Sequence, residues 1–154
     1  MKAVLSALLL VLVLGCLATM NVEASSSEEI SLFDSKGKPV AYIADDDDQT
    51  IYLWDGKPAA YLYGDDWKAG IDVYGFNGKH LGWFKGGIMY DHDGYAVGGI
   101  KRVFTSPVQL EPLKSLKELK PLKSLKELRP LKPIFAKTWS DVPLKHFLKD
   151  GLEE

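Results

Sequence analysis

The residue types that most often perform chemistry are sparse in this chain and form no recognised catalytic motif. The three histidines, His80, His92 and His146, are scattered along the sequence. No serine, histidine and acidic residue stand in a catalytic motif, and there is neither a glycine-rich phosphate loop nor zinc-type ligand spacing. We therefore expect no enzymatic activity and no cofactor. A hydrolase, the alternative, would need a polar cleft with a strongly perturbed histidine or carboxylate.

Two acidic stretches invite comparison with metal sites. Asp91-His92-Asp93 combines ligand types, but it falls in a hairpin tip where Asp93 is needed for the turn. Neighbouring side chains on a strand also point to opposite faces. Residues 45–48 are consecutive aspartates, yet they lack the spaced ligands and the glycine of an EF-hand loop. We expect a solvated loop at residues 45–48 and no metal site.

Cys16 is the one cysteine in the chain, so it cannot form an internal disulfide. It follows a lysine and an apolar run that is typical of a secretion signal and short for a membrane span. The string V-L-G-C ending at Cys16 resembles a bacterial lipobox, so we expect residues 1–24 to be a signal with lipid attached at Cys16. Cleavage before Ser25, which would release a secreted or periplasmic protein, is the alternative.

A turn motif recurs four times in residues 30–104, which indicates repeat architecture in which neighbouring units bury one another's faces. Asp55, Asn77 and Asp93 precede the turn glycine in three copies, and such pairs favour type I′ hairpins. The four turn glycines are Gly37, Gly56, Gly78 and Gly94. Four hairpins are predicted, preceded by a short linker at residues 25–29.

The positions after each glycine predict the two faces of the barrel wall. The fourth position is always tiny, and we expect these residues to crowd a common axis where the sheet closes: Ala41, Ala60, Gly82 and Gly98. Strand alternation puts the third and fifth positions on the other face. The third position is aliphatic: Val40, Ala59, Leu81 and Val97. The fifth is aromatic in three copies, Tyr42, Tyr61 and Trp83, which either line an apolar groove for a lipid or peptide or pack together.

The tail, residues 105–135, has leucine at every third position from Leu110 to Leu131. Its prolines exclude a long α-helix, whereas a three-residue screw such as polyproline II keeps the leucines on one edge. The other two edges are basic and mixed. Residues 25–100 carry 6 basic and 13 acidic side chains, and residues 101–149 carry 12 and 4. Because the barrel is acidic and the tail is basic, we expect the tail to dock on its own barrel or to attract a partner or anionic lipid. We expect no binding of nucleic acid.

Residues 136–154 contain one further predicted element. The stretch WSDVPLKHFLKDG reads as a short amphipathic helix that begins at an N-cap, Ser140, and ends before Gly151. Val142, Phe147 and Leu148 would form its apolar side. We expect this helix to cap one open end of the barrel.

The turn strings DGKP, NGKH and DG, the lipobox-like signal and the leucine-lysine-proline tail together resemble the bacterial four-fold β-flower proteins. That resemblance implies an all-β fold, a small closed four-fold-symmetric barrel of four hairpins. It implies no active-site residues, and it suggests membrane association. Gly99 departs from the aromatic pattern of the fifth position.

These observations lead to a functional hypothesis. We expect a lipid-anchored binding or structural module of the bacterial cell envelope, whose apolar barrel surface is covered by its own tail or by a protein partner that the sequence does not identify. The alternative is a lipid-binding barrel, similar to tubby-like proteins, that acts at anionic membranes.

Overall fold

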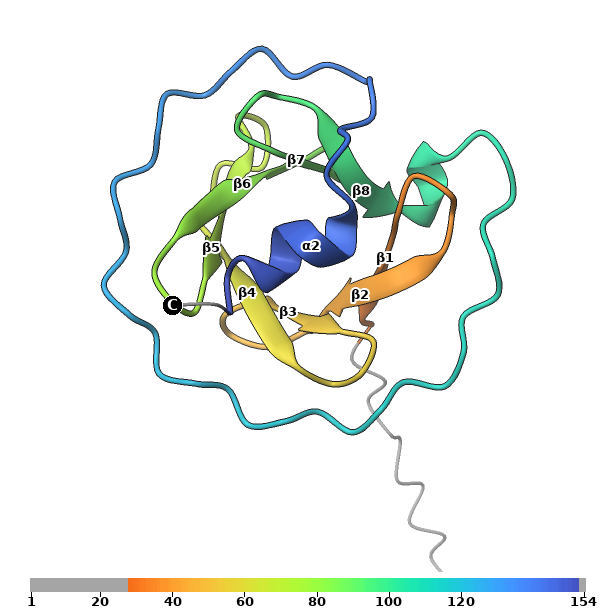
Figure 1. Ribbon diagram of the computed structural model, residues 1–154, viewed down its shortest axis with the longest axis horizontal. Helices are drawn as coiled ribbons and strands as arrows, with labels where there is room; N and C mark the ends of the chain where they lie inside the picture. The colour runs from red at the N-terminus through yellow and green to blue at the C-terminus, as the bar shows by residue number, and fades with distance from the viewer. Residues whose placement is uncertain (1–27, 153–154) are drawn as a thin grey trace, which may run out of the picture.

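The computed structural model describes residues 28–152, and their strands form one closed antiparallel barrel (Figure 1). Each strand pairs with the next, and β1 pairs with β8 to close the ring. The strands are β1 (Ile30–Phe33), β2 (Pro39–Ile43), β3 (Thr50–Leu53), β4 (Pro58–Tyr63), β5 (Ile71–Gly75), β6 (His80–Lys85), β7 (Ile88–Tyr90) and β8 (Ala96–Ile100). The predicted all-β closed barrel is confirmed. Cys16 and the predicted signal lie outside the described residues.

The four hairpin turns share one geometry, which is not the predicted type I′. In the second hairpin, Gly56 donates its N–H to the Leu53 carbonyl at 2.9 Å, and Leu53 donates to the Lys57 carbonyl at 2.8 Å. A type I′ turn needs positive φ at both central residues. Among the described non-glycine residues only Gln49 has positive φ, so Asp55 does not meet this condition. The hairpins instead use a three-residue loop that ends in a left-handed glycine.

A β-bulge in every hairpin overturns the predicted alternation of faces. The pairing register shifts once per hairpin, after Leu32, Ile51, Val73 and Met89. The unpaired extra residue is the aliphatic third position of each repeat, namely Val40, Ala59, Leu81 and Val97. These residues join or pack against the central core instead of sharing the outer wall with the aromatics. A bulge sets two residues against one, which breaks strict alternation.

The four small residues predicted at the axis are all buried. Ala41 and Ala60 belong to the central core cluster. A Cβ placed on Gly82 would lie 1.9 Å from the Tyr90 carbonyl oxygen, and one on Gly98 would lie 2.6 Å from Leu144 Cδ2. The crowding at these two positions therefore comes from a neighbouring strand and from the C-terminal helix, as well as from convergence of the strands.

One short helix, α2 (Leu144–Lys149), lies across one end of the barrel (Figure 1). Leu144, Phe147 and Leu148 are buried and belong to the same core cluster as the inner faces of the strands. The helix begins three residues later than predicted, because Pro143 and not Ser140 occupies the N-cap position. Val142 precedes the helix and is 44% exposed, so it is not part of the apolar side.

Between the short 3₁₀ turn η1 (Lys101–Val103) and α2, the described chain forms no helix and no strand beyond a single bridge between Ala96 and Trp139. This segment runs around the outside of the barrel as an open ring (Figure 1). The predicted extended tail is confirmed, and it surrounds the barrel that precedes it.

Candidate functional site

Aromatic side chains cover the outer wall of the barrel in three panels, each shared by two adjacent hairpins. The first panel is Tyr42, Tyr52 and Trp54, and the second is Tyr61, Tyr74 and Phe76. The third is His80, Trp83, Tyr90, His92 and Phe135. Tyr42, Tyr61 and Trp83, the side chains predicted for an apolar groove, are at most 1% exposed. A lipid or peptide could reach them only if the tail moved away.

The basic edge of the tail covers these panels. The Lys114 ammonium lies 4.4 Å from the ring centre of Tyr42, and the Lys123 ammonium lies 4.4 Å from that of Tyr61. Such contacts contribute about 0.5–2 kcal/mol each, depending on desolvation. Burial, with the nearby Glu29 carboxylate and Tyr52, raises the pKa of Tyr42 to about 12. Its phenol therefore stays neutral beneath the lysines.

The same basic edge forms ion pairs with acidic residues of the barrel. Lys114 and Lys117 both bind the Glu29 carboxylate, at 2.8 and 2.6 Å. Burial disfavours the charged form of Glu29, but the hydrogen bonds and charges of these lysines outweigh it and lower the Glu29 pKa. Lys120 and Lys123 pair with Asp48. The hydrogen bond from Lys123 is the largest cause of the lowered Asp48 pKa. The aspartate run at residues 45–48 therefore supplies anchor points for the tail.

The mixed edge of the tail binds the hairpin turns through its backbone. Tail N–H groups donate to the carbonyl of each turn glycine at 2.8–3.0 Å: Gln109 to Gly37, Glu118 to Gly56, Glu127 to Gly78, and Ala136 to Gly94. The donors are spaced nine residues apart, the length of the tail's own repeat. In an extended three-residue screw, nine residues advance about 28 Å. The sequence period of the tail therefore matches the hairpin spacing of the barrel.

The third edge of the tail points away from the barrel. Its side chains, which we call the leucine belt, are 94–98% exposed: Leu110, Leu113, Leu116, Leu119, Leu122, Leu125, Leu128, Leu131 and Ile134. No side chain of the described residues covers this apolar stripe. The barrel already has an aromatic wall, which binds cations, and acidic loops. The lysines of the basic edge bind both the aromatic rings and the carboxylates, so this edge faces the barrel and the leucines face outward.

The fourth side of the barrel lacks an aromatic panel of this kind, and the ring of the tail is open there. Gly99 replaces the aromatic residue, and a Cβ at this position would lie 2.6 Å from Val103 Cγ2. The absence of a side chain lets Phe104 pack edge-on against Phe33 at 6.1 Å and stack on Trp139 at 5.6 Å. The missing aromatic at Gly99 thus makes room for the chain that leaves the barrel.

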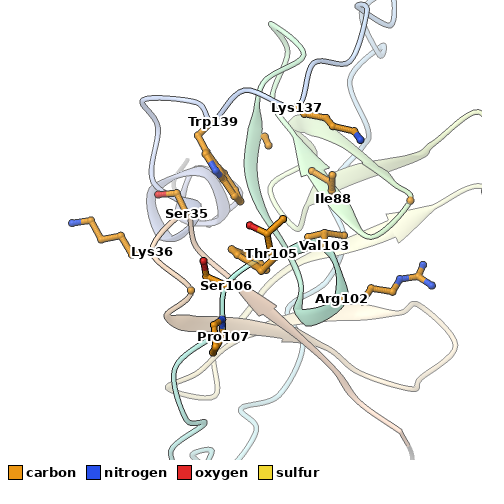
Figure 2. Close-up of a pocket in the computed structure, with 14 residues that line it drawn as sticks. Ser35, Lys36, Ile88, Arg102, Val103, Thr105, Ser106, Pro107, Lys137 and Trp139 are labelled. Carbon is orange, nitrogen blue, oxygen red and sulfur yellow. The ribbon is translucent and has the colours of Figure 1, made fainter.

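A pocket of about 710 Å³ lies in this opening (Figure 2). Trp139, Ser35, Thr105 and Ser106 face it, whereas Lys36 extends away from its centre (Figure 2). The pocket therefore offers hydroxyl groups and an indole surface, and it holds none of the histidines or carboxylates that hydrolysis would require. In residues 28–152, no group of three or more histidine, cysteine or acidic side chains could hold a metal ion.

A family model described as 4-fold beta flower protein matches residues 30–148. The chain belongs to this family. The match includes the tail and most of α2, so the β-flower of this chain comprises the barrel together with its encircling segment. No curated protein and no solved structure matches the chain. Neither the β-flower family nor its barrel is a known class of enzyme.

Sequence reasoning found the β-flower tail and its three edges but missed which edge would face outward. The signal was present in the alternation of leucine and lysine beside an acidic barrel. It also missed the contact between the two histidines, which lie on different strands and turns. No helix among residues 28–152 is long and apolar enough to cross a membrane.

Proposed function

We propose that this β-flower protein is a lipid-anchored module of the bacterial cell envelope that rests against a bilayer through part of its leucine belt. The observation that carries the proposal is the near-complete exposure of nine aliphatic side chains, at 94–98%, on a tail that is otherwise bound to the barrel. An exposed apolar stripe of this length is typical of an interaction surface. Catalysis and nucleic-acid binding have no part in this proposal.

The charges around the belt favour an apolar contact. Lys114, Lys117, Lys120, Lys123 and Arg129 all pair with barrel carboxylates, so these charges point toward the barrel. The outward edge is therefore apolar. Fully burying one leucine contributes about 1.5–3 kcal/mol, so three leucines of one repeat would bind appreciably.

The proposed anchor supplies proximity to a bilayer. The described chain begins at Glu28, twelve positions after Cys16, and twelve steps of a fully extended chain span at most about 43 Å. A lipid on Cys16 would keep the barrel within this distance of the membrane surface. The belt would then bind at high local concentration, which allows a weak contact to be occupied.

The arc that carries the second repeat is the best candidate for the contact. Tyr63 and Trp67 are 51% and 48% exposed, and Lys126 lies 4.3 Å from the Tyr63 ring centre. Lys132 binds the carbonyls of Ala69 and Gly70 in the loop that contains Trp67. Exposed tyrosine and tryptophan prefer the membrane interface. Leu122, Leu125 and Leu128 would accompany them into the bilayer.

The test places an environment-sensitive fluorophore on the full-length chain attached to vesicles of zwitterionic lipid. We expect emission from a label at Leu125→Cys to shift to shorter wavelength and to be quenched by brominated acyl chains. The matched position in the first repeat, Leu116→Cys, and the turn position Asp93→Cys should respond less. If the label at Leu125→Cys behaves as it does without vesicles, the belt does not contact the bilayer.

The basic charge of the tail also supports a second candidate, binding of the tail to anionic lipid. That mode requires the lysines to leave their carboxylate partners, and each lysine near the surface would contribute about 1 kcal/mol. It predicts binding that needs anionic lipid and weakens with salt, whereas contact through the leucine belt predicts neither dependence. Vesicles with and without anionic lipid, at low and high salt, distinguish the two.

The anchor itself is tested by mass spectrometry of the mature N-terminus. A diacylated Cys16 supports the proposal, whereas a free N-terminus at Ser25 would make the protein secreted or periplasmic. In that case a contact through the leucine belt would have to hold the protein at the membrane without help.

A further inference from the structure

The third aromatic panel contains two imidazole rings in direct contact. His80 Nδ1 and His92 Nε2 lie 2.9 Å apart, and the rings stack with an interplanar angle of 11°. His80 is 2% exposed, and its Nε2 lies 3.2 Å from Asp72 Oδ1. The other oxygen of Asp72 accepts a hydrogen bond from Arg129 of the tail at 3.1 Å. We call these four residues, Asp72, His80, His92 and Arg129, the histidine latch.

The hydrogen bonds of the histidine latch fix where its protons lie. Arg129 donates to one oxygen of Asp72, and His80 donates its Nε2–H to the other oxygen. His80 Nδ1 is then an acceptor, and His92 donates its Nε2–H to it. A proton added to the outer nitrogen of His92 leaves this chain of hydrogen bonds intact. A proton added to His80 Nδ1 would set two N–H groups against each other and break it.

The groups that face His80 come from every element packed on it. β5 contributes Asp72 and Tyr74, whose ring centre lies 5.0 Å away. The tail contributes Glu127, whose side chain accepts the His80 backbone N–H at 2.7 Å, and Arg129. Trp83 of β6 packs on the ring at 4.8 Å and carries no charge. Burial is the largest influence and lowers the pKa of His80, although Asp72 favours the charged form.

The lowered pKa of His80 determines whether acid strengthens or weakens docking of the tail. Burial in the docked structure lowers the pKa of His80, whereas release of the tail would expose the ring to water and let it take a proton near its ordinary pKa of about 6.5. The released state therefore binds more protons, so acid favours release. Docking at this panel should be strongest well above pH 6.5 and should weaken as the pH falls through this value.

We propose that the histidine latch makes docking of the tail's last arc, residues 127–136, sensitive to mild acid, while the first arc stays bound. The first arc, around Lys114, Lys117 and Lys120, is held by carboxylates and has no histidine partner among the described residues. Trp83 Nε1 also finds no acceptor among the described residues. Release would expose this donor to water and so offset part of the cost.

This inference rests on the proposed function only for its consequence, namely that acid would free the arc nearest Tyr63 and Trp67 to rearrange at a membrane. Release itself is measured without lipid. Hydrogen exchange of the full chain compares two equivalent amides, Glu118 bound to Gly56 at 2.9 Å and Glu127 bound to Gly78 at 3.0 Å. The protection of each is expressed relative to its intrinsic exchange rate at each pH.

Between pH 7.5 and pH 5 we expect protection at Glu127 and Ala136 to fall at least tenfold while protection at Glu118 stays within twofold. His92→Asn keeps an N–H donor toward His80 and removes the charge interaction by which His92 lowers the His80 pKa, so it should shift the loss to lower pH. His146→Asn, on α2, should leave the profile unchanged. Equal loss at Glu118 and Glu127, or no loss at either, would overturn the proposal whether or not the leucine belt contacts a bilayer.

Discussion

The backbone N–H of Glu118 donates to the carbonyl oxygen of Gly56 at 2.9 Å, and the tail repeats this contact at every hairpin turn. The acceptor glycines have φ between +70° and +93°. A left-handed residue turns its carbonyl out of the hairpin ladder, and the lack of a Cβ allows close approach. One glycine per hairpin therefore both closes the turn and fixes the register of the tail.

The first prediction concerns this glycine. A Cβ on Gly56 would lie 2.0 Å from the Leu116 carbonyl oxygen. We expect Gly56→Ala to displace the tail locally, to raise hydrogen exchange at Glu118, and to cost about 2 kcal/mol or more of unfolding free energy. Gly86 also has positive φ, at +59°, but nothing lies within 4 Å of its Cβ position. Gly86→Ala should cost about 1 kcal/mol and leave the tail docked, and equal effects of the two changes would contradict the prediction.

The second prediction concerns the barrel axis. Gly82→Ala should destabilise the protein by about 3 kcal/mol, because its Cβ would meet the Tyr90 carbonyl at 1.9 Å and the β6–β7 pair would have to separate. Ala60→Gly, at the matched position of the second repeat, should cost about 1–2 kcal/mol through backbone entropy and the loss of one buried methyl group. Urea unfolding measures both. Similar losses would show that the axis has room to spare.

The third prediction concerns the helix across the barrel end. Leu144 is fully buried, and we expect Leu144→Ala to lower the unfolding free energy by about 2–5 kcal/mol by leaving a cavity in the core. Val142 is 44% exposed, so Val142→Ala should change it by less than about 0.5 kcal/mol. If the two substitutions had comparable effects in thermal unfolding, α2 would not complete the core.

The fourth prediction separates strong acid from mild acid. The Asp48 pKa is lowered, chiefly by its hydrogen bond from Lys123, so the docked state holds fewer protons than the released state. This contribution is present above pH 3.8, the ordinary value, and is lost as the pH falls below it. Tail exchange in the first and second arcs should therefore rise below about pH 4. Asp48→Asn should make exchange near Lys123 faster at pH 7 and less dependent on acid, and an unchanged profile would contradict the role of this pair.

The amino-acid sequence was sufficient to predict the barrel, because the turn glycines and the small residues that indicate it are local and repeated. Gly56 and its three equivalents mark the turns, and Ala41, Ala60, Gly82 and Gly98 mark the buried face. Eight short strands with such turns have few ways to satisfy their backbone hydrogen bonds other than closing on themselves. The bulges were not predictable in the same way, because a bulge inserts one residue without changing the turn signals around it.

The three-residue period of the tail likewise determined its extended form and its three edges, since only a three-residue screw keeps leucine, lysine and the mixed positions apart. The period did not determine which edge of the tail would bind the barrel. That depended on where the barrel placed Glu29, Asp48 and its tyrosines, which come from separate strands and loops. The proximity of His80 to His92 arose in the same way, from two hairpins brought together by closure. Orientation and proximity are properties of surfaces that exist only after folding, so the tertiary structure alone decided that the leucines face outward.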